Sequence, residues 1–260
     1  MLRKSFYGNA LLAALTLLSM NNVFAGTITP AFLSPDSSLP IRSFRLTSDN
    51  TIAKPAIATH RHARDFNTQY LRQNEHMLHA IRERSSNYFA IMDSVFTRFG
   101  IPTEVKYLAI VESQLKPRIR SRAGAVGAWQ LMPVTARHFS LRVNKYQDER
   151  TDFYKSTVAA AKYLKYLYKI FDDWLLVMAA YNGGPGTVFK AIRKSGSRDF
   201  WKLQQFLPAE TRGHVKKFIS THYFFEEGGS IVTLTKAERL KYEVAMMEWE
   251  KESSLCELAE

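Results

Sequence analysis

The sequence predicts a mainly α-helical domain with an extended N-terminal arm and a short C-terminal tail. Apolar residues recur at three- and four-residue steps through most of the chain from Phe66 onward, as on the buried face of a helix. Strict alternation of apolar and polar residues nowhere persists long enough to predict a substantial sheet. At 260 residues, the chain is long enough for one folded domain with appendages.

The first 25 residues have the layout of a secretory signal peptide. A short apolar run follows the positive charges of Arg3 and Lys4, and Val23 and Ala25 occupy the −3 and −1 positions of a cleavage point. The apolar run is about half the ~20 residues that span a bilayer, although an uncleaved anchor is the alternative. We therefore expect export to the periplasm of a Gram-negative cell and a soluble mature protein without a stable membrane anchor.

The chain is basic and nearly free of cysteine. Its formal net charge is +12, which falls to +10 once Arg3 and Lys4 are removed (12 − 2). Basic surfaces attract polyanions, so nucleic acid and anionic cell-wall polymers are both considered, and export favours the wall. The single cysteine, Cys256, excludes an intramolecular disulfide and is a poor basis for a zinc site or a thiol nucleophile.

Residues 26–65 precede the helical pattern and read as a linker or loosely attached arm. Four of the nine prolines lie there among many serines and threonines, without a clear period. From Phe66 the apolar spacing predicts one long amphipathic helix, or two in series, ending at Gly100. We expect the main domain to comprise residues 66–227.

The remaining elements follow in order along the domain. A helix is expected from about Thr103 to Glu112, followed by a loop over residues 117–127. Further helices are expected at residues 133–139, 152–171, 173–180, 186–194 and 208–226. The tail, residues 228–260, contains a candidate short strand at 231–234 and an acidic helix from Lys236, and its role is unknown.

Glu112 is the first candidate functional residue. Val105, Leu108, Ala109 and Glu112 share one helical face, on which three positions are apolar and the last is a carboxylic acid. Burial beside apolar groups and the helix C-terminus both favour the neutral, protonated carboxyl. Such a group can donate a proton to a leaving oxygen. The alternative is a helix-end glutamate that turns to solvent or pairs with Lys116 or Arg118.

Two other segments can build a binding site. Gly124 and Gly127 allow a tight turn, after which Trp129 and Gln130 offer a stacking face beside an amide, as sugar sites do. The alternative is a turn followed by a buried tryptophan. An apolar helix also ends at Tyr181-Asn182 before a glycine-rich turn. Those two side chains can point into a cleft, although a simple helical hairpin is the alternative.

The last segment considered, residues 207–218, reads as scaffold. Glu210 lies in the first turn of a predicted helix, where a negative charge is favourable, and we expect it to pair with Arg212. The seven histidines include no pair with metal-binding spacing. The alternating tyrosines and lysines of residues 163–169 mimic a nucleic-acid face, but one amphipathic helix with solvated lysines explains them.

Four motifs follow one another in the chain: Glu112-Ser113, the turn of residues 127–130, residues 180–184 and residues 210–212. In this order they resemble the lytic transglycosylases of the soluble-lytic-transglycosylase type, which are related in fold to goose-type lysozyme. The tryptophan before Gln130, and Asp148-Glu149-Arg150 ahead of the long helix, are most similar to the membrane-bound lytic murein transglycosylase D branch. The resemblance covers about residues 75–226.

The resemblance implies a lysozyme-like helical domain whose cleft binds peptidoglycan glycan strands, without metal or organic cofactor. It implies that Glu112 acts as general acid and then as general base in cleaving the MurNAc-GlcNAc β-1,4 bond. The MurNAc 6-hydroxyl would then close a 1,6-anhydro ring. Ser113 and Gln130 would contact the substrate, while Tyr181 and Asn182 would lie beside the scissile sugar and orient Glu112.

Three alternatives remain open from the sequence. Ordinary glycosidases use two carboxylates, whereas only one lies in a motif here. Asp148, Glu149 or Asp152 could still fold back into the cleft, so a water-using muramidase is one alternative. A non-catalytic wall-binding protein is the second, and a basic DNA-binding protein, which conflicts with export, is the third.

The sequence departs from the resembled family in two places. A lipid-attachment cysteine is absent near the cleavage point, and the tail is shorter than the LysM repeats that often follow this domain.

Overall fold

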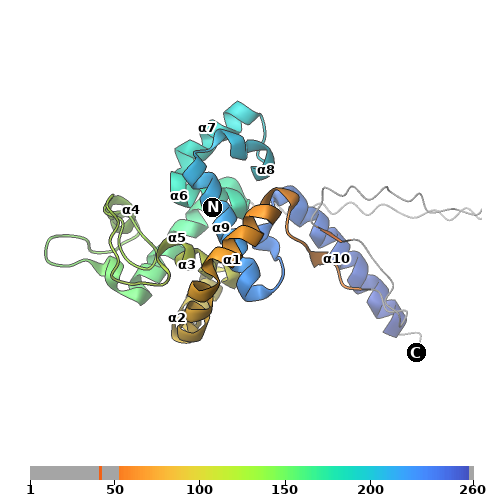
Figure 1. The fold of residues 1–260 in the computed structure, drawn as a ribbon, viewed down its shortest axis with the longest axis horizontal. Coiled ribbons are helices and arrows are strands. Elements are labelled where there is room, and N and C mark those ends of the chain that lie inside the picture. The colour runs from red at the N-terminus through yellow and green to blue at the C-terminus, as the bar shows by residue number, and fades with distance from the viewer. Residues whose placement is uncertain (1–40, 43–52, 258–260) are drawn as a thin grey trace, which may run out of the picture. The chain divides into compact units, whose positions relative to one another are not determined.

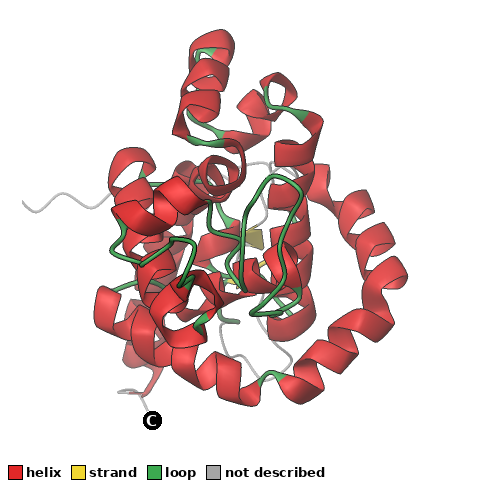
Figure 2. Cartoon of the chain, turned by 90° about the vertical axis from the view of Figure 1, so that its left-hand side faces the viewer, coloured by secondary structure: helices red, strands yellow, loops and turns green. Residues whose placement is uncertain are grey.

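The computed structural model describes residues 41–42 and 53–257 of the chain. The expected signal peptide and most of the expected arm lie outside the described residues. Within the described ranges the regular secondary structure is almost entirely helical, and the mainly α fold class is confirmed (Figures 1 and 2). The two described strands, β1 (Ile41–Arg42) and β2 (Ala56–Ile57), form one short antiparallel pair.

Most α-helices of the described residues lie close to the positions predicted from the sequence, whereas α8 was not predicted and α1 begins before Phe66. The described α-helices are α1 (Arg61–Arg84), α2 (Ser86–Phe99), α3 (Tyr107–Ser113), α4 (Pro133–His138), α5 (Phe153–Phe171), α6 (Trp174–Gly183), α7 (Pro185–Ser195), α8 (Phe200–Leu203), α9 (Ala209–Glu226) and α10 (Lys236–Glu257). The short 3-10 helices are η1 (Thr103–Lys106), η2 (Glu149–Thr151), η3 (Gln204–Phe206) and η4 (Ile231–Thr233). None of these described helices is long and apolar enough to cross a membrane.

The first expected helix consists of two helices in series, α1 and α2, which meet at Ser85. The Ser85 side chain is buried, and its hydroxyl donates a hydrogen bond to the carbonyl oxygen of Arg82 at 3.2 Å. Gly100 ends α2 in the left-handed conformation at φ +66°, as expected for a glycine at this position. The two-helix version of the prediction is therefore the correct one.

The segment before residue 66 is more ordered than a loosely attached arm. Helix α1 begins at Arg61, and Ala63 is only 1% exposed. His60 stacks on Trp201 of α8 with ring centroids 4.0 Å apart and ring planes 6° from parallel. Residues 61–65 are thus helical, and His60 packs on a helix far away in the sequence.

The candidate strand at residues 231–234 is also wrong, because these residues form the 3-10 helix η4 and its cap. The Ser230 hydroxyl accepts the backbone N–H of Val232, and the Thr233 hydroxyl accepts the N–H of Ser230, so local groups satisfy the backbone. Val232 and Leu234 are buried. This part of the tail therefore belongs to the core of the domain.

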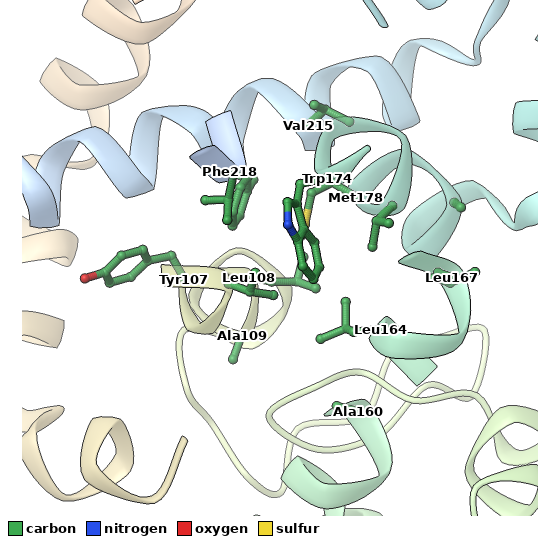
Figure 3. Close-up of a cluster of buried hydrophobic side chains, with 14 of the residues drawn as sticks. Tyr107, Leu108, Ala109, Ala160, Leu164, Leu167, Trp174, Met178, Val215 and Phe218 are labelled. Carbon is green, nitrogen blue, oxygen red and sulfur yellow. The ribbon is translucent and has the colours of Figure 1, made fainter. Parts of the chain in front are cut away.

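Helix α3 lies at the centre of the packing and carries Glu112 at its end. Its neighbours include α9 and η1, and α6 packs on α5 and α9 around it. Figure 3 shows Leu108 facing Trp174 and Phe218, with Leu164 of α5 beneath. All four of these side chains are at most 4% exposed, and burial of each contributes roughly 1.5–3 kcal/mol. The short helix is therefore a rigid support for the residues that follow.

Candidate active site

Glu112 lies in the last turn of α3, where the left-handed Gln114 at φ +55° ends the helix. Its side chain is 14% exposed, and its Oε1 atom lies 2.9 Å from Nε2 of His214 on α9. The predicted apolar stripe is confirmed, since Val105, Leu108 and Ala109 are fully buried. Glu112 therefore neither turns to solvent nor pairs with a neighbouring cation, and the alternative role considered for it is wrong.

His214 is the partner that the sequence analysis missed. Its side chain is 9% exposed, and its Nδ1 atom is buried without a hydrogen-bond partner among the described residues. His214 shares the inner face of α9 with Thr211, Val215 and Phe218, at the spacing i−3, i, i+1 and i+4. A histidine on such an apolar face is the signal that could have marked it, but the spacing does not say which residue it meets.

Ser113 is buried behind Glu112 and is 5% exposed. Its hydroxyl donates to the carbonyl oxygen of Ala128 at 2.7 Å and accepts the backbone N–H of Lys116 at 3.2 Å. These bonds tie the end of α3 to the turn of residues 124–131. The hydroxyl proton is thus already used by the scaffold, and a substrate contact through Ser113 stays a prediction.

The turn itself is built around Gly127 and Gln130. Gly127 has φ +88°, and a Cβ atom there would lie 2.1 Å from the carbonyl oxygen of Arg150. Gln130 has φ +45°, and its side-chain amide donates to the carbonyl oxygen of Gly127 at 2.9 Å. Trp129 is fully buried, and its indole N–H donates to the Thr157 hydroxyl at 2.9 Å. Of the two alternatives for Trp129, the buried tryptophan is therefore the correct one and the stacking face is wrong.

Tyr181 joins the end of α6 to this turn. Its hydroxyl donates to the carbonyl oxygen of Trp129 at 2.7 Å. Burial raises the pKa of Tyr181, and the negative charge of Glu112 raises it further, so the phenol stays a neutral donor close to that carboxylate. Asn182 follows at the end of α6 and is half-buried. The structure thus brings Glu112, Ser113, Tyr181 and the turn together.

The buried side chain of Arg150 holds the two ends of the turn in place. The Arg150 side chain is 2% exposed, and its Nη1 atom donates to the carbonyl oxygens of Gly124 and Leu131 at 2.8 and 2.9 Å. Its Nε and Nη2 atoms both bind the Asp148 carboxylate at 2.8 Å. These hydrogen bonds hold the pKa of Asp148 below its usual value. The motif Asp148-Glu149-Arg150 was visible in the sequence, whereas the hydrogen bonding of Arg150 to the turn was not.

The three other candidate carboxylates all have structural partners. Asp148 is bound by Arg150, as above, and Glu149 pairs with Lys155 at 2.7 Å, which lowers the pKa of Glu149. Asp152 caps α5 by accepting the backbone N–H of Lys155 at 2.9 Å. Glu112 is therefore the carboxylate of these four that is held by a histidine instead of by a scaffold cation or a helix end.

A groove of about 430 Å³ lies between α1, α3 and α9, and Glu112 itself is not among its lining residues. Val111 and Gln114, on either side of Glu112 in the sequence, form part of its wall. Gln69, Gln73 and Asn74 of α1 add three more amide side chains. Amides can both donate and accept hydrogen bonds, which suits ligands rich in hydroxyl and acetamido groups.

No described group of three or more His, Cys, Asp or Glu side chains could hold a metal ion.

Comparison with known families identifies the central part of the chain. Residues 97–204 match the model of the transglycosylase SLT domain. Over these residues the chain is similar to SLT domains. The matched segment begins within α2 and ends at the first residue of η3. It therefore contains Glu112, Gln130 and Tyr181, whereas His214 lies beyond the matched residues.

Two curated proteins similar to this chain are named lytic murein transglycosylases. The chain is 39% identical over 162 residues to the membrane-bound lytic murein transglycosylase D of Escherichia coli (strain K12). This match covers 60% of this chain and 35% of that protein. It is 31% identical over 140 residues to the soluble lytic murein transglycosylase of the same strain, covering 50% of this chain and 22% of that protein. The chain thus matches about a third or less of the length of these relatives.

A solved structure shows the same fold. It is the complex of the 70-kDa soluble lytic transglycosylase with bulgecin A, with a TM-score of 0.53 and 24% identity. The likeness covers 65% of this chain and 31% of that one. The expected helical fold is therefore shared with this lytic transglycosylase over the matched part of the chain.

Proposed function

We propose that this protein is a peptidoglycan lytic transglycosylase that cleaves the MurNAc-GlcNAc β-1,4 bond and leaves a 1,6-anhydro-MurNAc end. The observation that carries the proposal is the Glu112–His214 pair, 2.9 Å apart and nearly enclosed, at the end of a central helix that lies in the matched SLT segment. The 39% identity to a lytic murein transglycosylase supports the same substrate class.

The proposed reaction uses one carboxyl group twice. Protonated Glu112 first donates its proton to the glycosidic oxygen, which leaves with the GlcNAc as an alcohol. The Glu112 carboxylate then accepts the proton of the MurNAc 6-hydroxyl, whose oxygen attacks the anomeric carbon and closes the anhydro ring. Glu112 ends the cycle protonated and no water is consumed. His214 can stabilise the intermediate carboxylate by donating an Nε2–H hydrogen bond to Oε1.

The residues around Glu112 have separate proposed roles. Gln130 and Asn182 would bind the substrate, and Ser113 would contact it only as an acceptor, because its proton is donated to Ala128. Tyr181 would act as a positioning residue, since its hydroxyl holds the turn that carries Gln130.

The carboxylates near the site support a nucleophile supplied by the substrate. A glycosidase that uses water needs a second carboxylate, about 5–9.5 Å from the first. Asp148, Glu149 and Asp152 are each bound by a scaffold cation or a helix N-terminus, so the three candidates from the sequence are engaged elsewhere. This favours transglycosylation over a lysozyme-type hydrolysis.

The proposal extends to the cell compartment and the domain division. It places the protein in the periplasm, because residues 1–25 have the layout of a signal peptide. Residues 66–227 would form the catalytic domain, which contains the whole SLT match, with a tail at 228–260. Peptidoglycan glycan strands would be the partner, with no role for nucleic acid.

Digestion of purified sacculi by the protein and by Glu112→Gln tests the proposal. We expect wild type to release muropeptides with anhydro ends, one water lighter than the reducing products of a lysozyme, as measured by mass spectrometry. Glu112→Gln should lower the rate at least about 100-fold, the usual contribution of a general acid or base. Reducing ends would instead reveal a muramidase. Binding without release by either protein would overturn the enzymatic proposal.

A further inference from the structure

A second pocket, distinct from the groove between α1, α3 and α9, is lined by cations. It has a volume of about 680 Å³ and lies between the start of α1, which contributes His62, the end of α7, α8, η3 and α9. Its side chains include Lys194, Lys202, Arg212 and Lys216, whereas none of its lining residues is an aspartate or a glutamate. We call these four residues the basic pocket.

The four cations of the basic pocket have no counter-ion among residues 53–257. The described ion pairs and side-chain hydrogen bonds include none of their charged groups, and the expected pairing of Glu210 with Arg212 is absent. Arg212 and Lys216 are four residues apart on α9, a spacing at which like charges destabilise a helix. Burial lowers the pKa of Lys216, and the charge of Arg212 lowers it further. A bound anion would relieve this repulsion.

The basic pocket faces away from the candidate active site. His214 lies two residues from both Arg212 and Lys216 on α9, and side chains two positions apart on a helix point to different sides. His214 points inward to Glu112, whereas Arg212 and Lys216 line the pocket on another face. An anion there would not touch the reacting carboxyl group.

The uncharged lining suits a peptide better than a bare phosphate. Gln204 and Gln205 contribute amide groups that can pair with peptide bonds. Trp201, 8% exposed, and Phe206, 41% exposed, provide apolar walls for side-chain methylenes. The site is hollow, whereas binding to a lipid surface requires a face that can lie flat on it.

We infer that the basic pocket binds the free carboxylates of peptidoglycan stem peptides, as a second attachment site for the polymer. The identity of this ligand rests on the proposed function, while the anion site itself rests on the four unpaired cations. A stem peptide carries several carboxylates on a flexible backbone, which complements four cations with amide groups among them. Two sites on one strand would increase residence on the wall without any change in the chemistry.

Titration of the full-length protein with the free stem tetrapeptide, L-Ala-γ-D-Glu-diaminopimelate-D-Ala, tests the inference. The test variant is Lys194→Glu/Lys202→Glu, since both side chains are exposed and unpaired. The control, Arg98→Glu/Lys145→Glu, changes net charge equally at exposed residues outside the pocket. We expect the test variant to weaken tetrapeptide binding at least about tenfold, and the control less than about twofold. Sacculus binding in a Glu112→Gln background should fall in parallel.

Three other outcomes of the titration would contradict the inference. Equal tetrapeptide affinity in the test and control variants would overturn it, as would no binding at all. Inorganic phosphate or phosphatidylglycerol vesicles that bind more tightly than the tetrapeptide, and through the same lysines, would assign the pocket to phosphate groups. Failure of the proposed function would be separate, because tetrapeptide binding can be measured whether or not the protein releases muropeptides.

Discussion

At the scale of single residues, the contact between Glu112 and His214 favours one tautomer of the histidine. If Nε2 of His214 carries the proton, it donates to the Glu112 carboxylate and leaves Nδ1 as an unpaired acceptor. If Nδ1 carries the proton, a buried donor stays without a partner, since Nδ1 has none among the described residues. A buried N–H without an acceptor is the costlier defect. The contact therefore fits best the tautomer of His214 in which Nε2–H donates to Glu112.

Replacing His214 separates this role from simple packing. His214→Phe fills a similar volume but removes the donor, so the carboxylate of Glu112 loses a hydrogen bond of about 1.5–3 kcal/mol. We expect kcat for muropeptide release to fall roughly 10- to 100-fold, with KM little changed. His214→Gln retains an amide N–H and should restore most of the rate.

The pH dependence provides the second readout for His214. The variant His214→Gln cannot gain a proton, so a pH–rate profile that differs from wild type on its acid side would assign that limb to the histidine. A purely structural role would change thermal stability in both variants and leave the shape of the profile unaltered. Wild-type kcat in a folded His214→Phe would contradict the proposed role.

At the scale of elements, the turn of residues 124–131 is held at several points by neighbouring segments. Arg150 binds its two ends, Ser113 binds Ala128, and Tyr181 binds Trp129. These contacts come from η2, α3 and α6, which are far apart in the sequence. The turn thus couples the position of Gln130 to the helix that carries Glu112.

Two glycines of this turn allow the coupling to be tested with a matched control. Gly124 and Gly127 have φ of +90° and +88°, so alanine costs about 1 kcal/mol of backbone strain at each. Only at Gly127 would the new Cβ also meet the Arg150 carbonyl oxygen, at 2.1 Å. We expect Gly127→Ala to lower the free energy of unfolding by about 2–4 kcal/mol and to reduce activity strongly.

Urea unfolding and sacculus digestion of both glycine variants would measure the difference. Gly124→Ala, which has no atom within 4 Å of its Cβ, should lose only the strain energy and retain most activity. Equal losses in the two variants would show that backbone conformation, and not the close approach to Arg150, governs the turn.

The elements that the sequence predicted are those with a periodic apolar face. Helices α4, α5, α6, α7 and α9 begin and end within three residues of their expected bounds. Helix α8 was missed because its four residues are too short to show a period, and η4 was mistaken for a strand because a short apolar run fits both. Helix α1 begins before Phe66 because His60 is anchored by Trp201, a contact that no local pattern reveals.

The candidate site divides in the same way. Glu112 could be located from its own helix, because an acid at the end of an apolar stripe is anomalous within the eight residues 105–112. His214 could not, since its contact joins residues 102 positions apart. Trp129 was left with two alternatives, because sequence alone cannot distinguish a buried tryptophan from a binding face; its indole N–H donates to Thr157 in the core.

At the scale of the molecule, buried histidines connect the folded state to pH. His222 is fully buried on α9, and its Nε2 atom lies 2.9 Å from the Ser230 hydroxyl, which joins the helix to the segment before η4. Burial lowers the pKa of His222 to about 4, although the charge of Glu226 opposes this shift. His60 has a pKa lowered to about 4 as well, whereas burial raises the pKa of Asp173 to about 6 and acts in the opposite direction.

Because the folded pKa of His222 lies below the unfolded value of 6.5, the unfolded chain binds more protons between pH 6.5 and 4. Stability from His222 is full above pH 6.5 and falls by up to roughly 1.4 kcal/mol per pH unit below it. We expect urea unfolding to show that wild type loses more stability than His222→Gln between pH 6 and 5. The exposed His76→Gln is the control and should follow wild type. Parallel curves for wild type and His222→Gln would mean that His222 takes up its proton without unfolding.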